Sequence, residues 1–170
     1  MKKQQLKLAS FVFLFTFIAT NYLLSETIII SDKIKIIDGD TIILEKKKIR
    51  FSGIDAPETN FKSKSQFCLK NKEKINCGEI SKNSLIKKIT NKKLKCIIED
   101  KKDYFGRYLG ECFINNDSVS AYMVRNGFAL DYPKYSKNKY FKDQIHAKNN
   151  KLGLWSMQFE YPWIWRKNNR

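Results

Sequence analysis

The sequence predicts an α+β fold that is mainly β, a small, partly open barrel of five strands with three helices. Three observations lead to this prediction. Three short isoleucine-rich runs follow one another early in the chain, two more apolar runs come later, and three segments have helical character. Near-continuous apolar strands suit a small closed barrel better than a one-sided sheet. Five strands and three helices in this order are typical of a Greek-key barrel of the OB type.

The first three strands are expected at residues 34–37, 41–45 and 48–52. Each run is short, and isoleucine, which favours strands, occurs in all three. Asp38-Gly39 separates the first two strands, and a lysine run separates the second from the third. Together the three strands are expected to form a meander.

A loop and a helix are expected next. After Pro57 the chain becomes polar and rich in lysine, which indicates a loop closed by Cys68 and Cys77. The first helix is expected from about Glu79 to Thr90, because its apolar residues recur at helical spacing. Those residues are Ile80, Leu85, Ile86 and Ile89.

The last two strands are expected at residues 93–99 and 108–114. If Cys96 faces Cys112 across an antiparallel pair, the connection turns at residues 103–107. That tip contains a glycine, which adopts a positive φ without strain. The two strands complete the predicted barrel.

Two further helices are expected in the C-terminal part of the chain. One spans about Ser118 to Asn126, with Asp117 as its N-cap and Gly127 just past its end. The other spans about Lys139 to Leu152 and ends before Gly153. We find no internal repeat and no linker that would divide this region into two domains.

The composition is that of a globular and strongly basic chain. Its 170 residues fit one domain with an N-terminal appendage, and contents of 42% hydrophobic and 14% aromatic residues exclude a disordered chain. The formal net charge of +16 favours polyanionic partners such as nucleic acid, anionic lipid or acidic polysaccharide. A lysine-rich proteome is the alternative source of this charge.

Residues 1–25 have the pattern of an export signal. Three lysines precede an apolar stretch over residues 8–24. No clear cleavage site follows, and the stretch is nearly long enough to cross a bilayer, so a cleaved signal peptide and an uncleaved signal anchor are both expected alternatives. We assign the domain to residues 26–170. We expect export to the periplasm or the extracellular space, with a membrane tether through residues 8–24 if the signal is not cleaved.

Four cysteines follow the export signal: Cys68, Cys77, Cys96 and Cys112. An even number of cysteines in an exported chain predicts two disulfides, for which three connectivities are possible. Sequence proximity favours Cys68–Cys77 and Cys96–Cys112. The spacings do not resemble a zinc site, because the sequence has no Cys-x-x-Cys and no nearby histidine.

Three carboxylates and one arginine lie at the ends of predicted strands: Asp40, Asp55, Glu58 and Arg50. Carboxylate oxygens suit a hard cation such as Ca²⁺, which leaves coordination positions for water and a substrate phosphate. Clustered carboxylates repel one another unless a cation or an arginine lies beside them. The alternative interpretation is structural, with Asp38-Gly39 as a turn and residues 55–58 as a helix N-terminus or a solvated loop.

The order of these motifs resembles the staphylococcal nuclease (thermonuclease) family. The resemblance is carried by Asp-Gly-Asp-Thr at 38–41, Arg50, Asp-Ala-Pro-Glu-Thr at 55–59 and Tyr-Phe-Gly-Arg at 104–107. It continues through residues 121–127 and 153–156, and covers roughly residues 33 to 157. The cysteine placement and the tail at 162–166 resemble the exported proteobacterial members of the family.

The resemblance implies a Ca²⁺ site and a set of catalytic residues. Asp40 and Asp55 would bind Ca²⁺ through their carboxylates, and Ala56, which stands where the founding member has threonine, would bind it through its backbone carbonyl. Glu58 would orient or deprotonate the attacking water. Arg50 and Arg107 would bind the phosphate and neutralise charge in the transition state.

Three aromatic residues lie near positions that contact nucleotides in the family: Phe105, Tyr132 and Tyr135. Aromatic rings stack on bases with little sequence preference. The alternative is that these three are ordinary core or rim aromatics. The three tryptophans, in contrast, are expected to pin the C-terminal tail to the domain.

The function expected from the resemblance is that of a monomeric, Ca²⁺-dependent endonuclease. It would hydrolyse phosphodiester bonds in DNA, RNA or both, and leave 3′-phosphate ends. The alternative is a non-catalytic OB module that binds single-stranded nucleic acid. A structural protein of the cell envelope, the third hypothesis, would explain the export signal and the tail but none of the motifs.

Overall fold

The structure is a computed structural model that describes residues 26–170. The segment predicted to be a signal peptide or signal anchor, residues 1–25, lies outside the described residues. Within residues 26–170, no helix combines the length and the apolar character needed to cross a membrane.

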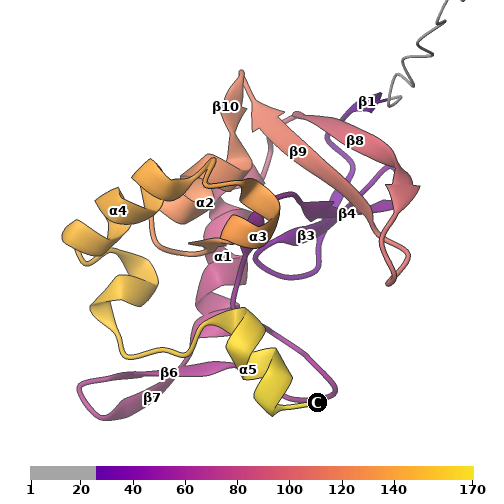
Figure 1. Cartoon of the computed structure of the whole chain (residues 1–170). Helices are drawn as coiled ribbons and strands as arrows, with labels where there is room; N and C mark the ends of the chain where they lie inside the picture. The colour runs from indigo at the N-terminus through magenta and orange to yellow at the C-terminus, as the bar shows by residue number, and fades with distance from the viewer. Residues whose placement is uncertain (1–25) are drawn as a thin grey trace, which may run out of the picture.

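The main sheet is curled into half a barrel, with strand order β1-β8-β9-β4-β3-β2 and β10 paired with β9 (Figure 1). The pair β4·β9 is parallel and the other pairs of this sheet are antiparallel. This arrangement confirms the predicted fold class. The strands are β1 (Glu26–Ser31), β2 (Ile34–Ile36), β3 (Thr41–Leu44), β4 (Lys47–Phe51), β8 (Leu94–Lys102), β9 (Tyr108–Ile114) and β10 (Asp117–Ser118).

The strand count differs from the five that the sequence predicts, because the main sheet also contains β1 and β10. β1 follows the apolar segment at 8–24 almost directly, and no turn residues separate the two. The sequence pattern therefore does not indicate a separate strand there. β10 has only two residues, too few for a periodic pattern. The predicted strand at 108–114 agrees residue for residue with β9.

The helices are more numerous than the three predicted. The described residues form α1 (Cys77–Ile89), α2 (Val119–Arg125), α3 (Pro133–Ser136), α4 (Phe141–Asn149), a 3₁₀ helix (Gly153–Ser156) and α5 (Pro162–Asn168). The three predicted helices correspond to α1, α2 and α4. The two additional α-helices, α3 and α5, are short and begin at proline, which is well suited to a first helical turn.

Ser118, not Asp117, is the N-cap of α2. The Ser118 side chain accepts a hydrogen bond from the backbone N–H of Ala121, and its backbone is extended as a cap requires. Asp117 instead pairs with Ile114 in the short β10·β9 ladder. The helix therefore begins one residue later than the sequence suggests.

The core fills the space between the curled sheet and helices α1 and α2. Along β4 and β9 buried residues alternate with more exposed ones, as they do in a half-buried sheet, whereas β3 is buried at three of its four residues. The largest fully buried side chains include Ile42, Leu44, Ile49, Phe51, Leu85, Leu94, Ile98 and Met123. The Cys96–Cys112 disulfide lies in this core and links directly paired residues of β8 and β9.

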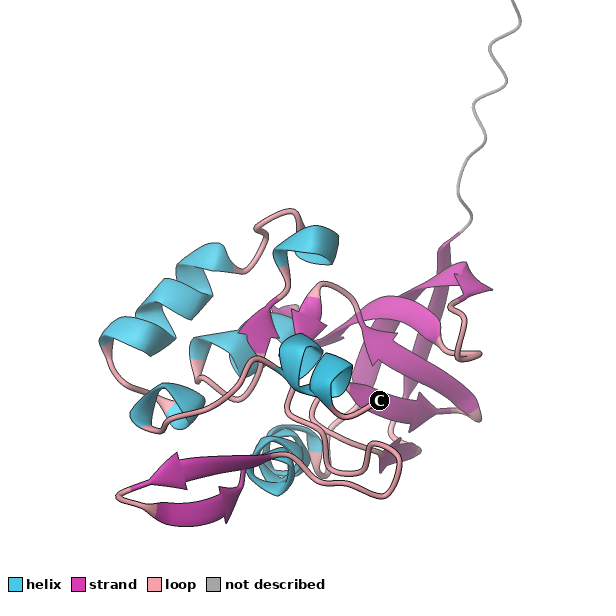
Figure 2. Ribbon diagram, turned by 60° about the horizontal axis from the view of Figure 1, so that its bottom comes forward, coloured by secondary structure: helices cyan, strands magenta, loops and turns pink. Residues whose placement is uncertain are grey.

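A hairpin stands where a loop was predicted after Pro57. β6 (Phe67–Lys70) and β7 (Glu73–Asn76) form an antiparallel pair at one end of the molecule (Figure 2). The two-residue turn Asn71-Lys72 has positive φ at both positions, as a type I′ turn requires. The sequence does not predict this turn, because lysine stands at the position where glycine is usual. The Cys68–Cys77 disulfide joins β6 to the start of α1.

Gly127 and Gly153 allow the end of α2 to pack tightly against the start of the 3₁₀ helix, since a Cβ added to Gly153 would lie 2.4 Å from the backbone oxygen of Gly127. Gly127 has φ +72°, and a Cβ added to it would lie 2.2 Å from the backbone oxygen of Leu152. The backbone N–H of Leu154 donates to the oxygen of Gly127 at 2.8 Å. This backbone contact fixes where the C-terminal tail leaves the helical layer.

We therefore expect Gly127→Ala to be strongly destabilising. The left-handed backbone costs alanine about 1–2 kcal/mol, and the overlap with Leu152 adds about 1–3 kcal/mol. Gly106→Ala is the matched control, because Gly106 has φ +73° but nothing lies within 4 Å of an added Cβ. Urea unfolding of both variants measures the difference, and equal losses of stability would contradict the role of the contact.

Candidate active site

The candidate site lies where β3, β4 and β5 meet. Asp40 directly precedes β3, Arg50 lies in β4, and Asp55 ends β5 (Ile54–Asp55), which pairs with β11 (Leu130–Asp131). Thr41 is paired with Arg50, and the backbone N–H of Phe51 donates to the oxygen of Asp40 at 2.8 Å. The strand register therefore brings together residues that lie up to 15 positions apart in the sequence.

Arg50 bridges two buried carboxylates. Its Nη1 lies 2.6 Å from Asp40 Oδ1, and its Nη2 lies 2.6 Å from Asp55 Oδ1. The Asp55 side chain is fully buried, and those of Asp40 and Arg50 are only 4% and 15% exposed. A planar guanidinium can serve two carboxylates at once with fixed geometry, which an ammonium cannot do.

Asp40 is held at both of its oxygens. Oδ1 also accepts a hydrogen bond from the Thr41 hydroxyl at 2.8 Å, and Oδ2 accepts from the backbone N–H of Ala56 at 3.0 Å. The Asp40 backbone N–H donates to Asp38 Oδ1 at 3.0 Å. Asp38 is thus a fourth carboxylate of the site, one that the sequence analysis assigned only to a turn.

Arg166 is the residue of the site that the sequence analysis missed. It lies in α5, and its Nη2 is 2.8 Å from Asp55 Oδ2 while its Nη1 is 2.6 Å from Glu58 Oε1. Asp55 is therefore paired with two guanidiniums, one at each oxygen. The sequence signal was available, since Arg166 ends the aromatic tail motif at 162–166.

The charges of the site are strongly coupled. Burial raises the pKa of Asp38 to about 8, and the charge of Asp40 adds to the rise. Burial also raises the pKa values of Asp55 and Glu58, against the opposing effects of Arg50 on Asp55 and of Arg166 on both. For Asp40 burial acts in the same direction and is the largest single effect, but the charge of Arg50 and the hydrogen bonds from Ala56, Asp38 and Thr41 together outweigh it and lower the pKa.

A ladder of aromatic rings holds the C-terminal tail in place. The ladder consists of Trp155, Phe159, Tyr161, Trp163, Tyr132 and Tyr135, each in contact with the next. Tyr132 and Trp163 stack with their ring centroids 4.7 Å apart and their planes 5° apart. Stacked and edge-to-face rings both contribute to stability. The tail that carries Arg166 is thus packed against α3 and the core.

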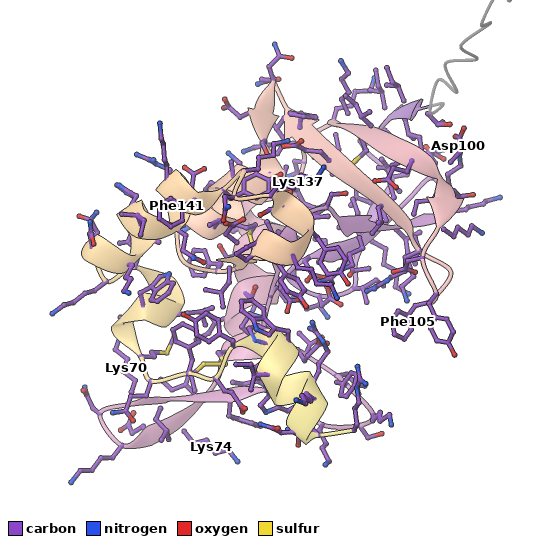
Figure 3. The ribbon with its side chains drawn as sticks, in the orientation of Figure 1. Lys70, Lys74, Asp100, Phe105, Lys137 and Phe141 are labelled. Carbon is purple, nitrogen blue, oxygen red and sulfur yellow. A yellow bond between two sulfur atoms is a disulfide. The ribbon has the colours of Figure 1, made fainter. Side chains whose placement is uncertain are left out.

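Two of the predicted nucleotide-contacting residues belong to this ladder. Tyr132 is half-buried under Trp163, and Tyr135 is exposed beside it. Phe105 lies instead at the tip of the β8–β9 hairpin, where it is 70% exposed (Figure 3). Phe105 is therefore the most accessible of the three rings.

Arg107 stands at the base of the same hairpin tip, where it forms an ion pair with Asp103, four residues earlier in the sequence. Its Nη2 and Nε lie 2.7 and 2.9 Å from Asp103 Oδ2, and its guanidinium lies 5.2 Å from the centroid of the Phe105 ring. The structure thus places Arg50 among the carboxylates and Arg107 beside the exposed aromatic tip.

The donor chemistry of the site fits a hard divalent cation. Four carboxylates, of Asp38, Asp40, Asp55 and Glu58, face two guanidiniums, which leaves a formal charge of −2 when all four acids are ionised. Oxygen donors with excess negative charge are what such a cation requires. Over residues 26–170, however, no three His, Cys, Asp or Glu side chains are arranged as a formed metal-binding group. In this structure arginines hold the carboxylates.

The chain is similar to nucleases of a known family. The model of the family described as staphylococcal nuclease homologue matches residues 48–157. This range includes Arg50, Asp55, Glu58 and Arg107, whereas Asp40 and Arg166 lie outside it.

Individual relatives support the same similarity. The probable staphylococcal-like nuclease CAN3 of Oryza sativa subsp. japonica is 35% identical over 133 residues, which is 77% of this chain and 31% of that protein. Staphylococcal-like nuclease CAN1 of Arabidopsis thaliana is 32% identical over 78% of this chain and 37% of its own length. The succinoglycan biosynthesis protein ExoI of Rhizobium meliloti (strain 1021) is 30% identical over 74% of this chain and 64% of its own length.

The chain spans only about a third of the length of the plant relatives that it matches. The similarity therefore concerns one domain of those proteins.

We expect Arg50→Gln to unfold at a much lower urea concentration than the wild type. Removing one partner of a buried ion pair leaves uncompensated charge and costs about 3–5 kcal/mol. Arg125→Gln is the control, because its pair with Asp143 is half exposed at the arginine and is worth at most about 1 kcal/mol. The urea unfolding of both variants is measured in the presence of a chelator.

The difference in the free energy of unfolding between the wild type and Arg50→Gln should also depend on pH. The lowered pKa of Asp40 contributes stability above its ordinary value of 3.8, and this contribution is lost as the pH falls through the lowered value. The gap between wild type and Arg50→Gln is therefore expected to narrow in acid. A gap that stays constant from pH 7 to pH 3 would show that the Arg50–Asp40 pair is not its source.

Proposed function

Because the chain belongs to the staphylococcal nuclease family, we propose that it is a Ca²⁺-dependent endonuclease that hydrolyses DNA, RNA or both and leaves 3′-phosphate ends. The observation that carries this proposal is the pairing of Arg50 with Asp40 and Asp55 at the strand ends, with Glu58 in the same network. A constellation of oxygen donors and guanidiniums is what phosphodiester hydrolysis needs.

The cation would be held by Asp40, Asp55 and the backbone carbonyl of Ala56. When bound, Ca²⁺ would polarise a phosphoryl oxygen and offset the negative charge of the site. Its binding is favoured by the excess of carboxylate charge over guanidinium charge at the site. Asp38 adds to this excess only when it is deprotonated, because burial and the charge of Asp40 raise its pKa to about 8.

The side chains of the site would then activate the water and bind the phosphate. Glu58 orients the attacking water or accepts its proton, and its position two residues after Ala56 puts it beside the cation ligands. Arg50 binds a phosphate oxygen as charge develops in the transition state. Arg107 approaches from the hairpin, where the ion pair with Asp103 limits the directions in which its guanidinium can point.

Substrate binding is supported by the charge and by the hairpin tip. A net charge of +16 attracts a polyanion at long range. Tyr104 and Phe105 are 97% and 70% exposed at the tip and form an edge-to-face pair. Exposed rings next to an arginine are suited to stacking on bases without sequence preference. We propose that a single strand runs past this tip to the carboxylates.

We also propose that the protein is exported by residues 1–25. The support is the pair of disulfides in the described part of the chain, Cys68–Cys77 and Cys96–Cys112. Disulfides form and persist in oxidising compartments such as the periplasm and the extracellular space. Cleavage of the signal would release the domain, and an intact signal would tether it to a membrane.

The purified protein is expected to cleave single-stranded DNA or RNA with Ca²⁺ and to lose this activity in excess EGTA. Arg107→Ala is expected to lower kcat on the order of 10³-fold or more, because an arginine that neutralises transition-state charge is lost. Arg107 pairs locally, with Asp103, so the variant should fold. Gel electrophoresis measures the cleavage rate, and end-group analysis shows whether the products carry a 3′-phosphate.

Two results would argue against this proposal, one against the enzymatic activity and one against its dependence on Ca²⁺. Binding of single strands without any cleavage would favour the alternative of a non-catalytic OB module. Cleavage that persists unchanged in EGTA would refute the Ca²⁺ dependence but not the nuclease activity.

Phe105→Ala is expected to raise KM for single-stranded substrates and to leave kcat nearly unchanged. Loss of one stacking platform costs about 1–3 kcal/mol of binding. Phe141→Ala is the matched control, since Phe141 is 50% exposed on α4 and lies away from the hairpin tip in Figure 3. Steady-state kinetics on labelled oligonucleotides provide the measurement. Equal KM values for the two variants would remove Phe105 from the substrate path.

A further inference from the structure

The C-terminal helix α5 contributes directly to the candidate site through Arg166. Its guanidinium joins Asp55 and Glu58, at 2.8 and 2.6 Å. The side chain of Arg166 is 21% exposed, and those of Asp55 and Glu58 are 0% and 17% exposed. The contact is therefore shielded from solvent and spans more than 100 residues of sequence.

The position of α5 is determined by contacts that do not involve Arg166. Trp163 stacks on Tyr132, and Trp165 packs edge-on against Phe61 with ring centroids 6.2 Å apart. Trp165 of α5 lines one cavity together with Phe67 of β6 and Lys74 of β7, and α5 leads to the C-terminus (Figure 1). These two aromatic contacts anchor the helix independently of the ion pairs of Arg166.

One buried residue, Gln66, ties the Glu58 segment to the same tail. Its Nε2 donates to the backbone oxygen of Glu160 at 2.7 Å, and its Oε1 accepts from the backbone N–H of Glu58 at 3.3 Å. The backbone N–H of Gln66 donates to the oxygen of Glu58 at 2.8 Å. The backbone of Glu58 is therefore held by Gln66, and its carboxylate is held by Arg166.

Anchoring of the tail does not by itself explain an arginine at this position. A buried ion pair adds little net stability, because desolvation offsets the attraction between the charges. The rings and Gln66 already attach the tail. What the arginine fork adds is direction, since it binds one oxygen of Glu58 and one oxygen of Asp55 at fixed angles. Fixing one carboxylate oxygen also fixes where the other oxygen points.

We propose that Arg166 is a positioning residue of the active site, which orients the Glu58 carboxylate for its role with the attacking water and holds Asp55 from the side opposite Arg50. The C-terminal helix is then part of the catalytic machinery. This inference rests on the proposed nuclease function. It goes beyond that function, because none of the motifs to which a catalytic or metal-binding role was assigned contains Arg166, and the range that the family model matches ends at residue 157.

The test compares Arg166→Gln and Arg166→Lys with the wild type in the full-length protein. Substitution of a partner that orients an active-site ligand typically costs 10–100-fold in activity, so we expect kcat of Arg166→Gln to fall roughly 10- to 100-fold with KM for the oligonucleotide nearly unchanged. Lysine keeps the charge, but its ammonium cannot hold two carboxylates in the fixed geometry of the guanidinium fork, so Arg166→Lys should recover only a minor part of kcat. Arg125→Gln is the control with an exposed ion pair.

Hydrogen exchange of the α5 amides separates positioning from simple attachment. Positioning predicts that exchange in α5 stays near the wild-type rate in Arg166→Lys while kcat remains low. The proposal is overturned if kcat is unchanged in Arg166→Gln, if lysine restores it fully, or if it falls only together with faster exchange in α5. A wild-type protein that cleaves neither DNA nor RNA would overturn the nuclease function itself, and this proposal with it.

Discussion

The organisation of this protein depends on one buried guanidinium. Arg50 lies between Asp40 and Asp55, two carboxylates that the strand register brings close together. Without the guanidinium, mutual repulsion would force these carboxylates apart, or burial would favour their protonated forms. The pairing explains why the ends of β3 and β5 can meet in a water-poor region of a small barrel. It also leaves the site with more negative than positive charge, which is the electrostatic condition for recruiting a cation.

A second constraint comes from the opposite end of the chain. The aromatic ladder fixes the tail on α3 and the core, and Gly127 fixes where the chain crosses to reach it. Through these contacts Arg166 reaches Asp55 and Glu58. The site is therefore built from the barrel and the tail together, and hydrophobic packing far from the carboxylates determines how two of them are oriented. Packing of rings and positioning of charge are coupled in this fold.

Sequence reasoning succeeded where the signal was local. The strand at 108–114 could be placed because its apolar residues and flanking turn residues are contiguous. The site motif around Asp40, Arg50 and Asp55 could be recognised because its residues follow one another over a short stretch. The hairpin at residues 67–76 was missed because its type I′ turn is formed by Asn71-Lys72 without glycine. Short helices that begin at proline, such as α5, leave too few residues for a periodic pattern.

The family, the fold class and the site residues Arg50, Asp40, Asp55 and Glu58 could be predicted from the sequence, because they depend on local order and turn chemistry. Which guanidinium holds which carboxylate depends instead on tertiary packing. Arg107 pairs with Asp103, four residues away, whereas Arg166 crosses more than 100 residues to reach Asp55 and Glu58. The physical reason is that an ion pair between distant residues depends on how the helices and rings between them pack, and no local pattern in the chain records that packing.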